Sequence, residues 1–406
     1  MSPVVIESIM NQCTETVESA KECSFLGKDK INLALLWPEY EGRTTSVSDL
    51  VLGLEKERFN VIFIYLSGHG VDRNLREEAG YKVFYLSNIE LINAFRFSIL
   101  FELIKILKDH QIDVLHCHAH KPTVYGVMAA RFAKTPVVLS HVHGLGRSGN
   151  LRRKLTNFLL SRKCSRIISV ANGVKADVLR NNWHMPAKKV AVLENSVDYE
   201  RFAEVSVAKA DARGMLELSP EAFVFGMVGR LAPTKGLPHL IEAFSMVKED
   251  IPAAELLLFG NGPLRAELER QASNTPYCDS IHFLGHKDNI ERLYRAMDVF
   301  VLSSVAEGMP RAILEAMAAG VPCIATQVGG IPEILPNRDV GRLVPARDSN
   351  ALATAMIDLA SMPPGQLRQL AGNASDRARR LYSHEVVRKK LVELYESEFA
   401  LCLKGR

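Results

Sequence analysis

The sequence predicts an α/β protein with two doubly wound, Rossmann-like domains, each built around a parallel sheet. Short runs of apolar, β-branched residues alternate with segments of helical periodicity, and this alternation occurs in two successive series. The length of 406 residues also suits two domains of about 180 residues each. Because ligands of open α/β sheets bind at the carboxyl ends of the strands, we expect both domains to face one central cleft.

The strands are predicted from short apolar runs bounded by polar or turn residues. The first series is Ile31–Leu36, Phe59–Leu66, Val83–Leu86, Asp113–His116, Val137–Leu139, Ile167–Val170 and Val190–Leu193. Helical periodicity between these strands includes Thr45–Lys56, Phe97–His110 and Thr123–Lys134. The second series is Phe223–Val228, Glu255–Phe259, Ser280–Leu284, Val299–Leu302, Cys323–Ala325 and Gly341–Val344.

The two series divide the chain into domains. We assign residues 29–205 to the first domain and residues 221–384 to the second. Residues 206–220 are polar and lack strand character, which favours a linker. Residues 1–28 form an N-terminal extension, and residues 385–406 have the pattern of a C-terminal helix.

The bulk composition restricts the class of function. A net charge of +4 is small for this length, so charge gives no indication of a nucleic-acid partner. Seven cysteines are scattered without a CxxC pair, which favours reduced thiols in a cytoplasm over a disulfide framework. No apolar stretch approaches the length of a membrane span, and the amino end does not have the pattern of a secretory signal. We therefore expect a cytoplasmic protein.

Two glutamates, Glu307 and Glu315, bracket a turn and a helix start after the strand Val299–Leu302. Pro310 fits the first position of that helix, and Gly320 fits its end. An anion at the helix start would meet free backbone N–H groups and the positive end of the helix dipole. Carboxylates there would repel that anion, so we expect them to accept hydrogen bonds from hydroxyl groups. An anion joined to a polyol describes a nucleotide sugar; the alternative is two solvated surface glutamates.

The loop after Phe223–Val228 carries two cations, Arg230 and Lys235, in the pattern Gly-Arg-x4-Lys-Gly. The loop has neither the P-loop pattern nor the G-x-G-x-x-G pattern, so it gives no indication of ATP hydrolysis or of NAD chemistry. Two cations at the carboxyl end of a strand could instead stabilise the charge of a departing nucleoside diphosphate. The alternative is a pair of solvated surface cations. No Asp-x-Asp pair occurs in the sequence, so we expect no metal and no other cofactor.

The stretch Asp113–His120, DVLHCHAH, concentrates histidines at the end of a predicted strand. On a continuing strand His116, His118 and His120 would share one face, and Cys117 would point to the other. A zinc site needs four convergent ligands, which this spacing does not supply. A structural histidine cluster is one alternative. The functional interpretation is that these imidazoles face the cleft.

Taken together, these motifs resemble the retaining glycosyltransferases of family 4, also called group 1, which have the GT-B fold. The resemblance implies that Glu307 lies beside the donor sugar and that Glu315 binds the ribose. The Gly-Arg-x4-Lys-Gly stretch resembles the diphosphate-binding loop of this family. Many members have glycine where this chain has Pro310, which cannot donate an N–H. The cofactor-binding set implied for the donor is Arg230, Lys235, Glu307, Gly308, Met309, Pro310, Arg311 and Glu315.

The resemblance also assigns acceptor-side residues. It implies that His118 and His143 lie near the reacting centre, where His143 orients a hydroxyl or moves a proton. It further implies front-face substitution, in which the leaving phosphate helps to deprotonate the acceptor. The catalytic set is then His143, Glu307, Arg230 and Lys235, with Glu307 not acting as a nucleophile. Family members often have a Gly-Gly pair after the first strand, whereas this chain has only Gly42 there.

The segment Arg147–Arg166 is basic and amphipathic. One interpretation is peripheral contact with an anionic membrane, which would suit a lipid-linked acceptor. The alternative is a domain helix with its apolar stripe in the core. The resemblance also implies that the C-terminal helix crosses back onto the first domain.

The resemblance implies transfer of a sugar from a nucleoside diphosphate, expected to be UDP, to a hydroxyl acceptor of a glycan, lipid-linked or small molecule. A nucleotide-sugar 2-epimerase on the same fold is the alternative enzyme. A non-catalytic sugar-binding regulator is a weaker one, because Arg230, Lys235, Glu307 and Glu315 are all present. The base, the sugar and the acceptor are not fixed by the sequence.

Overall fold

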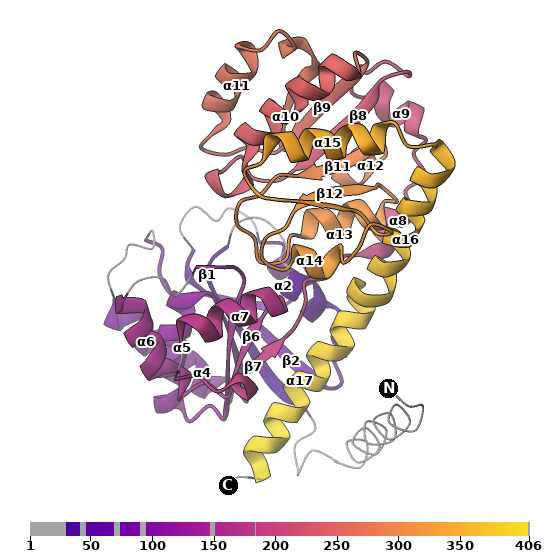
Figure 1. The fold of residues 1–406 in the computed structure, drawn as a ribbon. Coiled ribbons are helices and arrows are strands. Elements are labelled where there is room, and N and C mark those ends of the chain that lie inside the picture. The colour runs from indigo at the N-terminus through magenta and orange to yellow at the C-terminus, as the bar shows by residue number, and fades with distance from the viewer. Residues whose placement is uncertain are drawn as a thin grey trace, which may run out of the picture.

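The protein folds into two α/β domains, each with one parallel sheet, as predicted (Figure 1). The structure is a computed structural model, and it describes residues 30–40, 46–68, 74–89, 95–146, 151–182 and 184–404. Each of the thirteen expected strands overlaps an observed one, with ends that agree to within three residues. The predicted N-terminal extension and Gly42 lie outside the described residues.

The first sheet has seven strands in the order β3-β2-β1-β4-β5-β6-β7, all parallel. The strands are β1 Ile31–Glu39, β2 Phe59–Ser67, β3 Lys82–Tyr85, β4 Val114–His118, β5 Val137–Val142, β6 Arg166–Ser169 and β7 Val190–Val192. The helices between and after them are α2 Ser46–Leu52, α3 Leu75–Glu78, α4 Phe97–Asp109, α5 His120–Ala133, α6 Leu151–Ser161, α7 Asn172–Asn181, the 3₁₀ turn η1 Ala187–Lys189 and α8 Tyr199–Ala203.

Strand β1 runs three residues beyond its predicted end at Leu36. Pro38 has no N–H to donate, and in this part of β1 the strand pairs with a neighbour on one side only. Pairing with β4 ends at Leu36, whereas pairing with β2 continues to Glu39. The extension carries Trp37 to the carboxyl edge of the sheet, next to His118.

The turn between β4 and α5 corrects one sequence prediction. On a continuing strand His120 would have shared the face of His116, but Ala119 adopts a positive φ of 74° and turns the chain directly into α5. Positive φ is unfavourable for alanine, so this turn is strained. As a result His118 ends the strand, and His120 begins the helix instead of sharing the face of His116. Cys117 does face the other side, as predicted, where its Sγ lies against Gly126.

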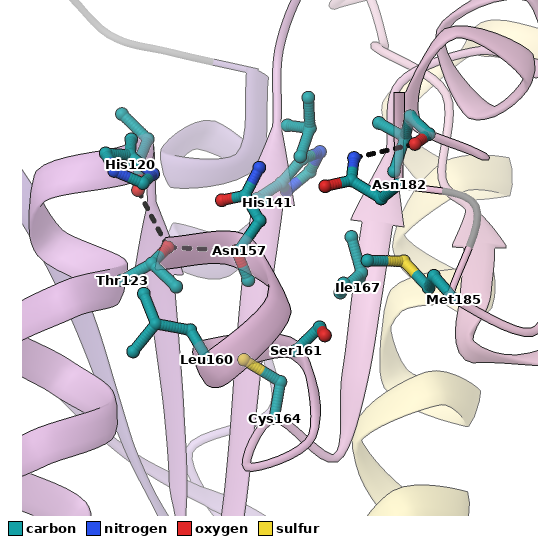
Figure 2. Close-up of a pocket in the computed structure, with 14 residues that line it drawn as sticks. His120, Thr123, His141, Asn157, Leu160, Ser161, Cys164, Ile167, Asn182 and Met185 are labelled. Atoms are coloured by element: carbon teal, nitrogen blue, oxygen red, sulfur yellow. Dashed lines mark hydrogen bonds between the residues drawn. The ribbon is translucent and has the colours of Figure 1, made fainter. Parts of the chain in front are cut away.

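A small internal cavity of about 60 Å³ lies between β5 and the helices α5, α6 and α7 (Figure 2). Its lining is mixed: polar side chains such as Thr123, Ser140, His141 and Asn157 stand beside apolar ones such as Leu160. Thr123 Oγ1 bonds the carbonyl of Ala119 at 2.8 Å and the hydroxyl of Ser140 at 2.9 Å. A cavity of this size holds one or two waters and is far too small for a sugar nucleotide.

The second sheet has six strands in the order β10-β9-β8-β11-β12-β13, also parallel. The strands are β8 Phe223–Val228, β9 Ala254–Phe259, β10 Ile281–Gly285, β11 Val299–Leu302, β12 Cys323–Thr326 and β13 Arg342–Val344. The helices are α9 Lys209–Gly214, η2 Pro233–Lys235, α10 Leu237–Asp250, α11 Arg265–Ser273, η3 Cys278–Ser280, α12 Ile290–Tyr294, α13 Arg311–Ala318, α14 Ile331–Ile334, α15 Ser349–Ala360, α16 Pro364–Tyr382 and α17 His384–Lys404.

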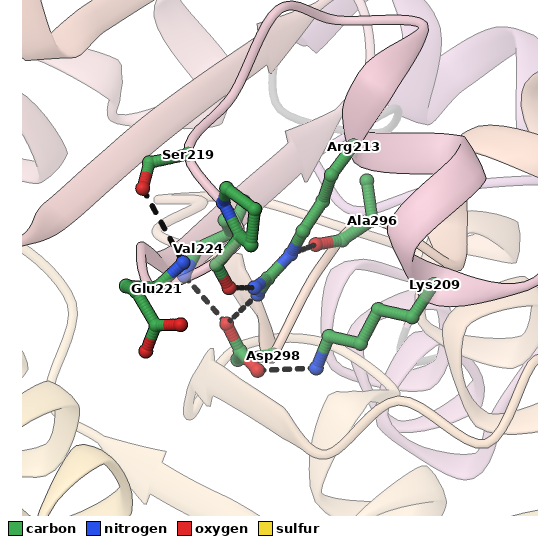
Figure 3. A network of polar contacts seen from close by, with 8 residues as sticks. Lys209, Arg213, Ser219, Glu221, Val224, Ala296 and Asp298 are labelled. Carbon is green, nitrogen blue, oxygen red and sulfur yellow. Dashed lines mark hydrogen bonds and ion pairs between the residues drawn. The ribbon is translucent and has the colours of Figure 1, made fainter.

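The segment that we expected to be a linker contains α9, and a carboxylate fastens this helix to the second sheet (Figure 3). Asp298 accepts a hydrogen bond from Arg213 at 2.6 Å and from the backbone N–H of Val224 at 2.7 Å, and it pairs with Lys209. Arg213 is 7% exposed, so its charge is taken out of water and is neutralised by Asp298. The segment is therefore docked on β8 and β11.

Helices α16 and α17 form a long rod that runs along both domains (Figure 1). The rod breaks at Ser383, where Val197 accepts from His384 N and donates to the carbonyl of Tyr382. Beyond the break, α17 packs into the core of the first sheet through Val387, Leu391, Tyr395 and Phe399. No helix in the described ranges combines the length and the apolar character needed to cross a membrane.

The two domains meet through closely packed backbone. A Cβ on Gly308 would lie 2.0 Å from the carbonyl oxygen of His143, so only glycine fits there. Beside this contact, the carboxylate of Glu333 on α14 accepts from the backbone N–H groups of Asn172 and Gly173 at 2.9 and 2.8 Å. Glu333 thus caps the N-terminus of α7 from the other domain, which also favours its charge at the helix dipole.

We predict that Asp298→Asn lowers the free energy of unfolding by about 2–4 kcal/mol, because Arg213 would keep a buried charge without its counterion. Chemical denaturation measures this change. Asp288→Asn is the control, since that side chain is 96% exposed and should change stability by less than about 0.5 kcal/mol. Equal stability of the two variants would contradict the fastening role of Asp298.

Candidate active site

An open cleft of about 620 Å³ lies where the two domains face each other. The second domain contributes most of its wall, and the first domain contributes α2 and the residues after β7. The lining residues include Asp49, Asp198, Arg201, Gly229, Arg230, Asn261, His286, Lys287, Arg311, Glu315 and His384. A cleft of this size accommodates a nucleotide, and cations outnumber carboxylates on its wall.

The loop after β8 places its two predicted cations in different settings. Arg230 is exposed and lines the cleft. Lys235 is 19% exposed and lies against Glu307, with Nζ 2.5 Å from Oε1. The loop closes at Gly236, where φ is 60° and an added Cβ would lie 2.2 Å from the carbonyl of Ser303. The close approach brings η2 against the strand end that leads to Glu307.

Glu307 is held by two donors on the same oxygen. Its Oε1 accepts from Lys235 Nζ at 2.5 Å and from Ser304 Oγ at 2.7 Å. Within the described part of the chain, Oε2 makes no hydrogen bond or ion pair. The arrangement leaves one oxygen to accept from a ligand hydroxyl, and the side chain is already oriented by the protein.

Glu315 lies on α13, the helix that follows Glu307, and its side chain has different partners. Tyr294 donates its hydroxyl to Oε2 at 3.1 Å, and Arg311 Nε lies 3.8 Å from Oε1. Burial, followed by the charge of Glu315, raises the pKa of Tyr294 well above its usual value, so this hydroxyl stays a donor. Arg311 also lies 3.4 Å from Asp49 on α2, which links Glu315 to the first domain.

The turn between the two glutamates differs in detail from the prediction. Pro310 is the N-cap of α13, with φ −72° and ψ 122°, and Arg311 is the first helical residue. We expected Pro310 at N1, the first helical position, so the helix begins one residue later than expected. Met309 is buried, and its carbonyl accepts from Asn195 Nδ2 at 2.6 Å. Met309 therefore joins this turn to the first domain, and the amides at the start of α13 have no intrahelical acceptor.

Four histidines form a row on the face of the first sheet that α17 covers. His116 Nδ1 lies 2.8 Å from the hydroxyl of Tyr395, and its Nε2 lies 3.2 Å from His141 Nδ1. His118 Nδ1 lies 3.1 Å from His143 Nε2. Burial lowers the pKa of His116 to about 3 and lowers that of His118 well below its usual value. These two rings are therefore neutral at physiological pH.

Three of these histidines, His116, His118 and His141, bring one ring nitrogen each within 4.8 Å of the others. This spacing alone would allow a metal ion. However, His116 uses both of its nitrogens, one toward Tyr395 and one toward His141. The contacts favour a hydrogen-bonded row of neutral imidazoles, and our expectation of a site without metal stays a prediction.

The structure brings most of the predicted site residues to one region. Lys235 contacts Glu307, Arg311 contacts Glu315, and Gly308 lies against the backbone of His143. Arg230 lies apart from the Lys235–Glu307 pair, on the cleft wall.

Sequence reasoning missed several cleft residues. Asp49 and His384 gave no signal, because each lies far along the chain from the motifs it faces. Trp37, which does not line the cleft, could have been noticed because it lies near the carboxyl end of the first strand, beside the predicted histidines. Its ring stacks on His118 with centroids 3.6 Å apart and an interplanar angle of 3°.

The basic segment forms α6, of which residues 147–150 and the side chains of 151 and 152 lie outside the described set. Leu155 and Leu159, one turn apart, are 62% and 60% exposed, so part of the apolar stripe faces solvent. On the same face of the sheet, Phe97 and Phe101 of α4 are 66% and 67% exposed. The alternative that the whole apolar stripe of α6 lies in the core therefore does not hold for Leu155 and Leu159.

Comparison with known proteins gives consistent matches over both domains. The family model described as Glycosyltransferase Family 4 matches residues 40–201, and the one described as Glycosyl transferases group 1 matches residues 209–379. A galactosyltransferase of Escherichia coli, named UDP-Gal:alpha-D-GlcNAc-diphosphoundecaprenol alpha-1,3-galactosyltransferase, is 32% identical over 280 residues, which cover 66% of this chain and 71% of that protein.

A second relative is the N,N'-diacetylbacillosaminyl-diphospho-undecaprenol alpha-1,3-N-acetylgalactosaminyltransferase of Campylobacter jejuni. It is 26% identical over 359 residues, covering 84% of this chain and 92% of the relative. Among solved structures, Anabaena HepE in complex with UDP superposes with a TM-score of 0.79 at 20% identity, covering 90% of this chain and 100% of HepE. The likeness to HepE establishes a shared fold.

We predict that the free energy of unfolding falls as the pH is lowered from 7 to 5. Burial lowers the pKa of His116 to about 3 and that of His384 to about 4, against about 6.5 in an unfolded chain. Below pH 6.5 these histidines bind a proton in the unfolded state but not in the folded state. Each histidine therefore lowers the free energy of unfolding by up to about 1.4 kcal/mol per pH unit. The stability that they contribute is complete above pH 6.5 and is lost toward pH 3–4.

Urea denaturation at pH 7, 6 and 5 measures this slope. The variant His384→Gln lacks one of the two groups, so its stability should fall less steeply with decreasing pH than that of the wild type. An identical slope in the variant would show that His384 titrates alike in the folded and unfolded states.

Proposed function

The chain belongs to the family 4, or group 1, glycosyltransferases, and from this premise we propose that it transfers a hexose from a UDP-sugar to a hydroxyl group of a lipid-diphosphate-linked sugar, with retention of configuration. The observation that carries the proposal is the meeting of the two donor motifs at one point. Lys235 of the Gly-Arg-x4-Lys-Gly loop bonds Glu307 of the Glu-x7-Glu segment at 2.5 Å. Neither motif alone would predict that contact, because the two lie about seventy residues apart in the sequence.

The charges of the cleft suit a nucleoside diphosphate. In this proposal Arg230, on the cleft wall, forks onto phosphate oxygens, and Lys235, on the same loop, has donors left beyond the one that it gives to Glu307. Glu315, oriented by Tyr294, would accept from the ribose hydroxyls. The proposal of UDP draws support from HepE, which was solved with UDP, and from the E. coli relative, which is named for UDP-galactose.

We further propose that no protein nucleophile takes part. The Oε1 atom of Glu307 already accepts from Lys235 and Ser304, and this suits a group that binds a sugar hydroxyl better than one that attacks carbon. The leaving phosphate then accepts the proton of the acceptor hydroxyl, while Arg230 and Lys235 stabilise its charge. Both relatives are named for α-linked products, which supports retention because the glycosyl bond of UDP-galactose is itself α.

Metal independence belongs to the same proposal. In this arrangement the fixed cations Arg230 and Lys235 take the role that a divalent ion has in other diphosphate sites. His143 would assist on the acceptor side, since its backbone packs on Gly308, directly after Glu307. The comparisons do not favour the epimerase alternative, because the two relatives with named reactions described above are sugar transferases.

The test is transfer of sugar from UDP-galactose, UDP-glucose, UDP-GlcNAc and UDP-GalNAc to farnesyl-diphosphate-linked GlcNAc, followed by mass spectrometry. Arg230→Ala should weaken UDP binding about 10- to 100-fold by calorimetry, because a charge-assisted contact is lost. Arg270→Ala removes an exposed cation of α11 and serves as the control. His143→Ala should depress turnover strongly while UDP binding stays nearly intact.

The same assay tests the other parts of the proposal. Turnover in EDTA should equal turnover without it; loss in EDTA that manganese restores would refute metal independence. Conversion of UDP-GlcNAc alone to an epimer or an elimination product would favour the epimerase. Wild-type turnover in His143→Ala would remove His143 from the site.

We also propose that α6 rests on an anionic membrane, where a lipid-linked acceptor would be found. Both relatives are named for undecaprenol-linked diphosphate substrates. Leu155 and Leu159 project into solvent, and Arg162 and Lys163 follow at the end of the helix. Apolar insertion together with cation attraction is the arrangement of an interfacial helix.

Co-sedimentation with liposomes tests this contact. The double variant Leu155→Glu/Leu159→Glu should bind vesicles of 30% phosphatidylglycerol at least about tenfold more weakly than the wild type, since it loses apolar area and adds repulsion. Leu401→Glu on α17, where the leucine is 59% exposed, is the matched control and should bind as the wild type does. Equal binding of the double variant would exclude α6 as the contact.

A further inference from the structure

Two consecutive serines follow strand β11 and lie between the two donor motifs. Ser303 and Ser304 are both buried, and their side chains have different partners. Ser303 Oγ donates to the backbone carbonyl of Lys235 at 3.0 Å. Ser304 Oγ donates to Oε1 of Glu307 at 2.7 Å. One serine thus holds the backbone of the loop that carries the cations, and the next serine holds the carboxylate.

The backbone around Ser304 is itself held in place. Thr326, the last residue of β12, is buried and donates its hydroxyl to the carbonyl of Ser304. The N–H of the next residue, Val305, donates to the carbonyl of Thr234 at 2.8 Å. The Ser304 hydroxyl therefore projects from a supported strand end, and in the described part of the chain it donates to Glu307 alone.

The other donor to Glu307, Lys235, lies beside the nucleotide cleft. A Cβ on Gly229, which lines the cleft, would lie 3.5 Å from Cε and 3.9 Å from Nζ of Lys235. The ammonium group is therefore next to the cleft wall and within reach of a ligand there. A diphosphate carries more negative charge than a carboxylate, so it attracts the same ammonium group. An ammonium group that serves a diphosphate holds Glu307 less tightly.

We propose that Ser304 is a positioning residue of the donor site, which keeps Glu307 oriented when Lys235 turns to the diphosphate. With a nucleotide sugar bound, the hold on Oε1 of Glu307 passes mainly to the buried Ser304 hydroxyl. The second carboxylate oxygen, Oε2, then stays directed at a hydroxyl of the donor sugar. This inference rests on the proposed glycosyltransferase function, because it needs a sugar diphosphate in the cleft.

A comparison of UDP with a complete UDP-sugar tests this role by calorimetry. The ligand is whichever of UDP-galactose, UDP-glucose, UDP-GlcNAc and UDP-GalNAc the wild type binds most tightly. In Ser304→Ala the Kd for UDP should stay within twofold of the wild type, since Arg230 and Lys235 are unchanged. The Kd for the UDP-sugar should rise at least about fivefold, because Glu307 no longer has a fixed direction toward the sugar.

Turnover provides a second readout. With farnesyl-diphosphate-linked GlcNAc as acceptor, kcat should fall about 10- to 100-fold in Ser304→Ala, because a hydrogen bond to a charged group is lost beside the reacting sugar. Ser304→Cys keeps the shape of the side chain but has a weak donor, so it should lose as much.

Ser349→Ala is the matched control. Ser349 is also buried, and its hydroxyl donates to Glu242 of the same domain at the same distance of 2.7 Å. Both alanine variants should lower Tm by similar amounts, because each loses one hydrogen bond from a buried serine to a glutamate. Ser349→Ala should nevertheless keep the wild-type kcat and both Kd values. A general loss of stability would not separate the two serines in this way.

A double variant shows whether Ser304 acts through Glu307. In a Glu307→Ala background, Ser304→Ala should change the Kd for the UDP-sugar less than twofold, because its acceptor is already missing. A further rise as large as in the wild-type background would mean that Ser304 acts by another route, and this would overturn the inference.

The remaining outcomes separate the inference from the proposed function. Wild-type Kd and kcat values in Ser304→Ala overturn the positioning role and leave the transferase intact. If the wild type forms no glycoside, the proposed transfer is overturned, and the ratio of the two Kd values still decides the role of Ser304. Equal weakening of UDP and UDP-sugar in Ser304→Ala, or a wild type that binds neither, overturns the inference.

Discussion

Contact between backbones of the two domains is the constraint on which the site depends. Gly308 lies so close to the carbonyl of His143 that no side chain can intervene, and Gly329 and Gly173 approach each other in the same way. Glu333 adds charge to this packing by capping α7 from the opposite domain. The turn that carries Glu307 therefore lies directly against the end of the histidine row in this structure.

The side chains of Glu307 and Glu315 are chemically identical, but different neighbours hold them. Glu307 has one oxygen committed to Lys235 and Ser304, whereas Glu315 is oriented by a tyrosine hydroxyl and by Arg311. Arg311 in turn faces Asp49, so the position of Glu315 is coupled to the first domain. The same logic applies to the imidazoles, where burial keeps His116 and His118 neutral and makes them hydrogen-bonding groups, not charges.

The fold class and the strand positions were predictable because fully buried parallel strands are continuous apolar runs, and such runs are visible in a sequence. The donor motifs were also visible, since Glu307 and Glu315 lie on one short segment. Contacts between distant segments were not, as with Asp49 and Arg311. Local strain was equally hidden: alanine gives no sign that residue 119 adopts positive φ, so the sequence did not reveal that a helix begins at His120.

The C-terminal helix has a practical consequence for anyone who wishes to exchange or isolate parts of this molecule. Helix α17 begins at the cleft with His384 and runs across the first sheet, where Tyr395 in its middle bonds the buried ring of His116. A chimera joined between the sheets near residue 205 would supply the first sheet with a foreign helix, and the amino-terminal half expressed alone would expose an uncovered apolar face to water. The unit that can be transplanted is discontinuous, and it must include the last twenty or so residues.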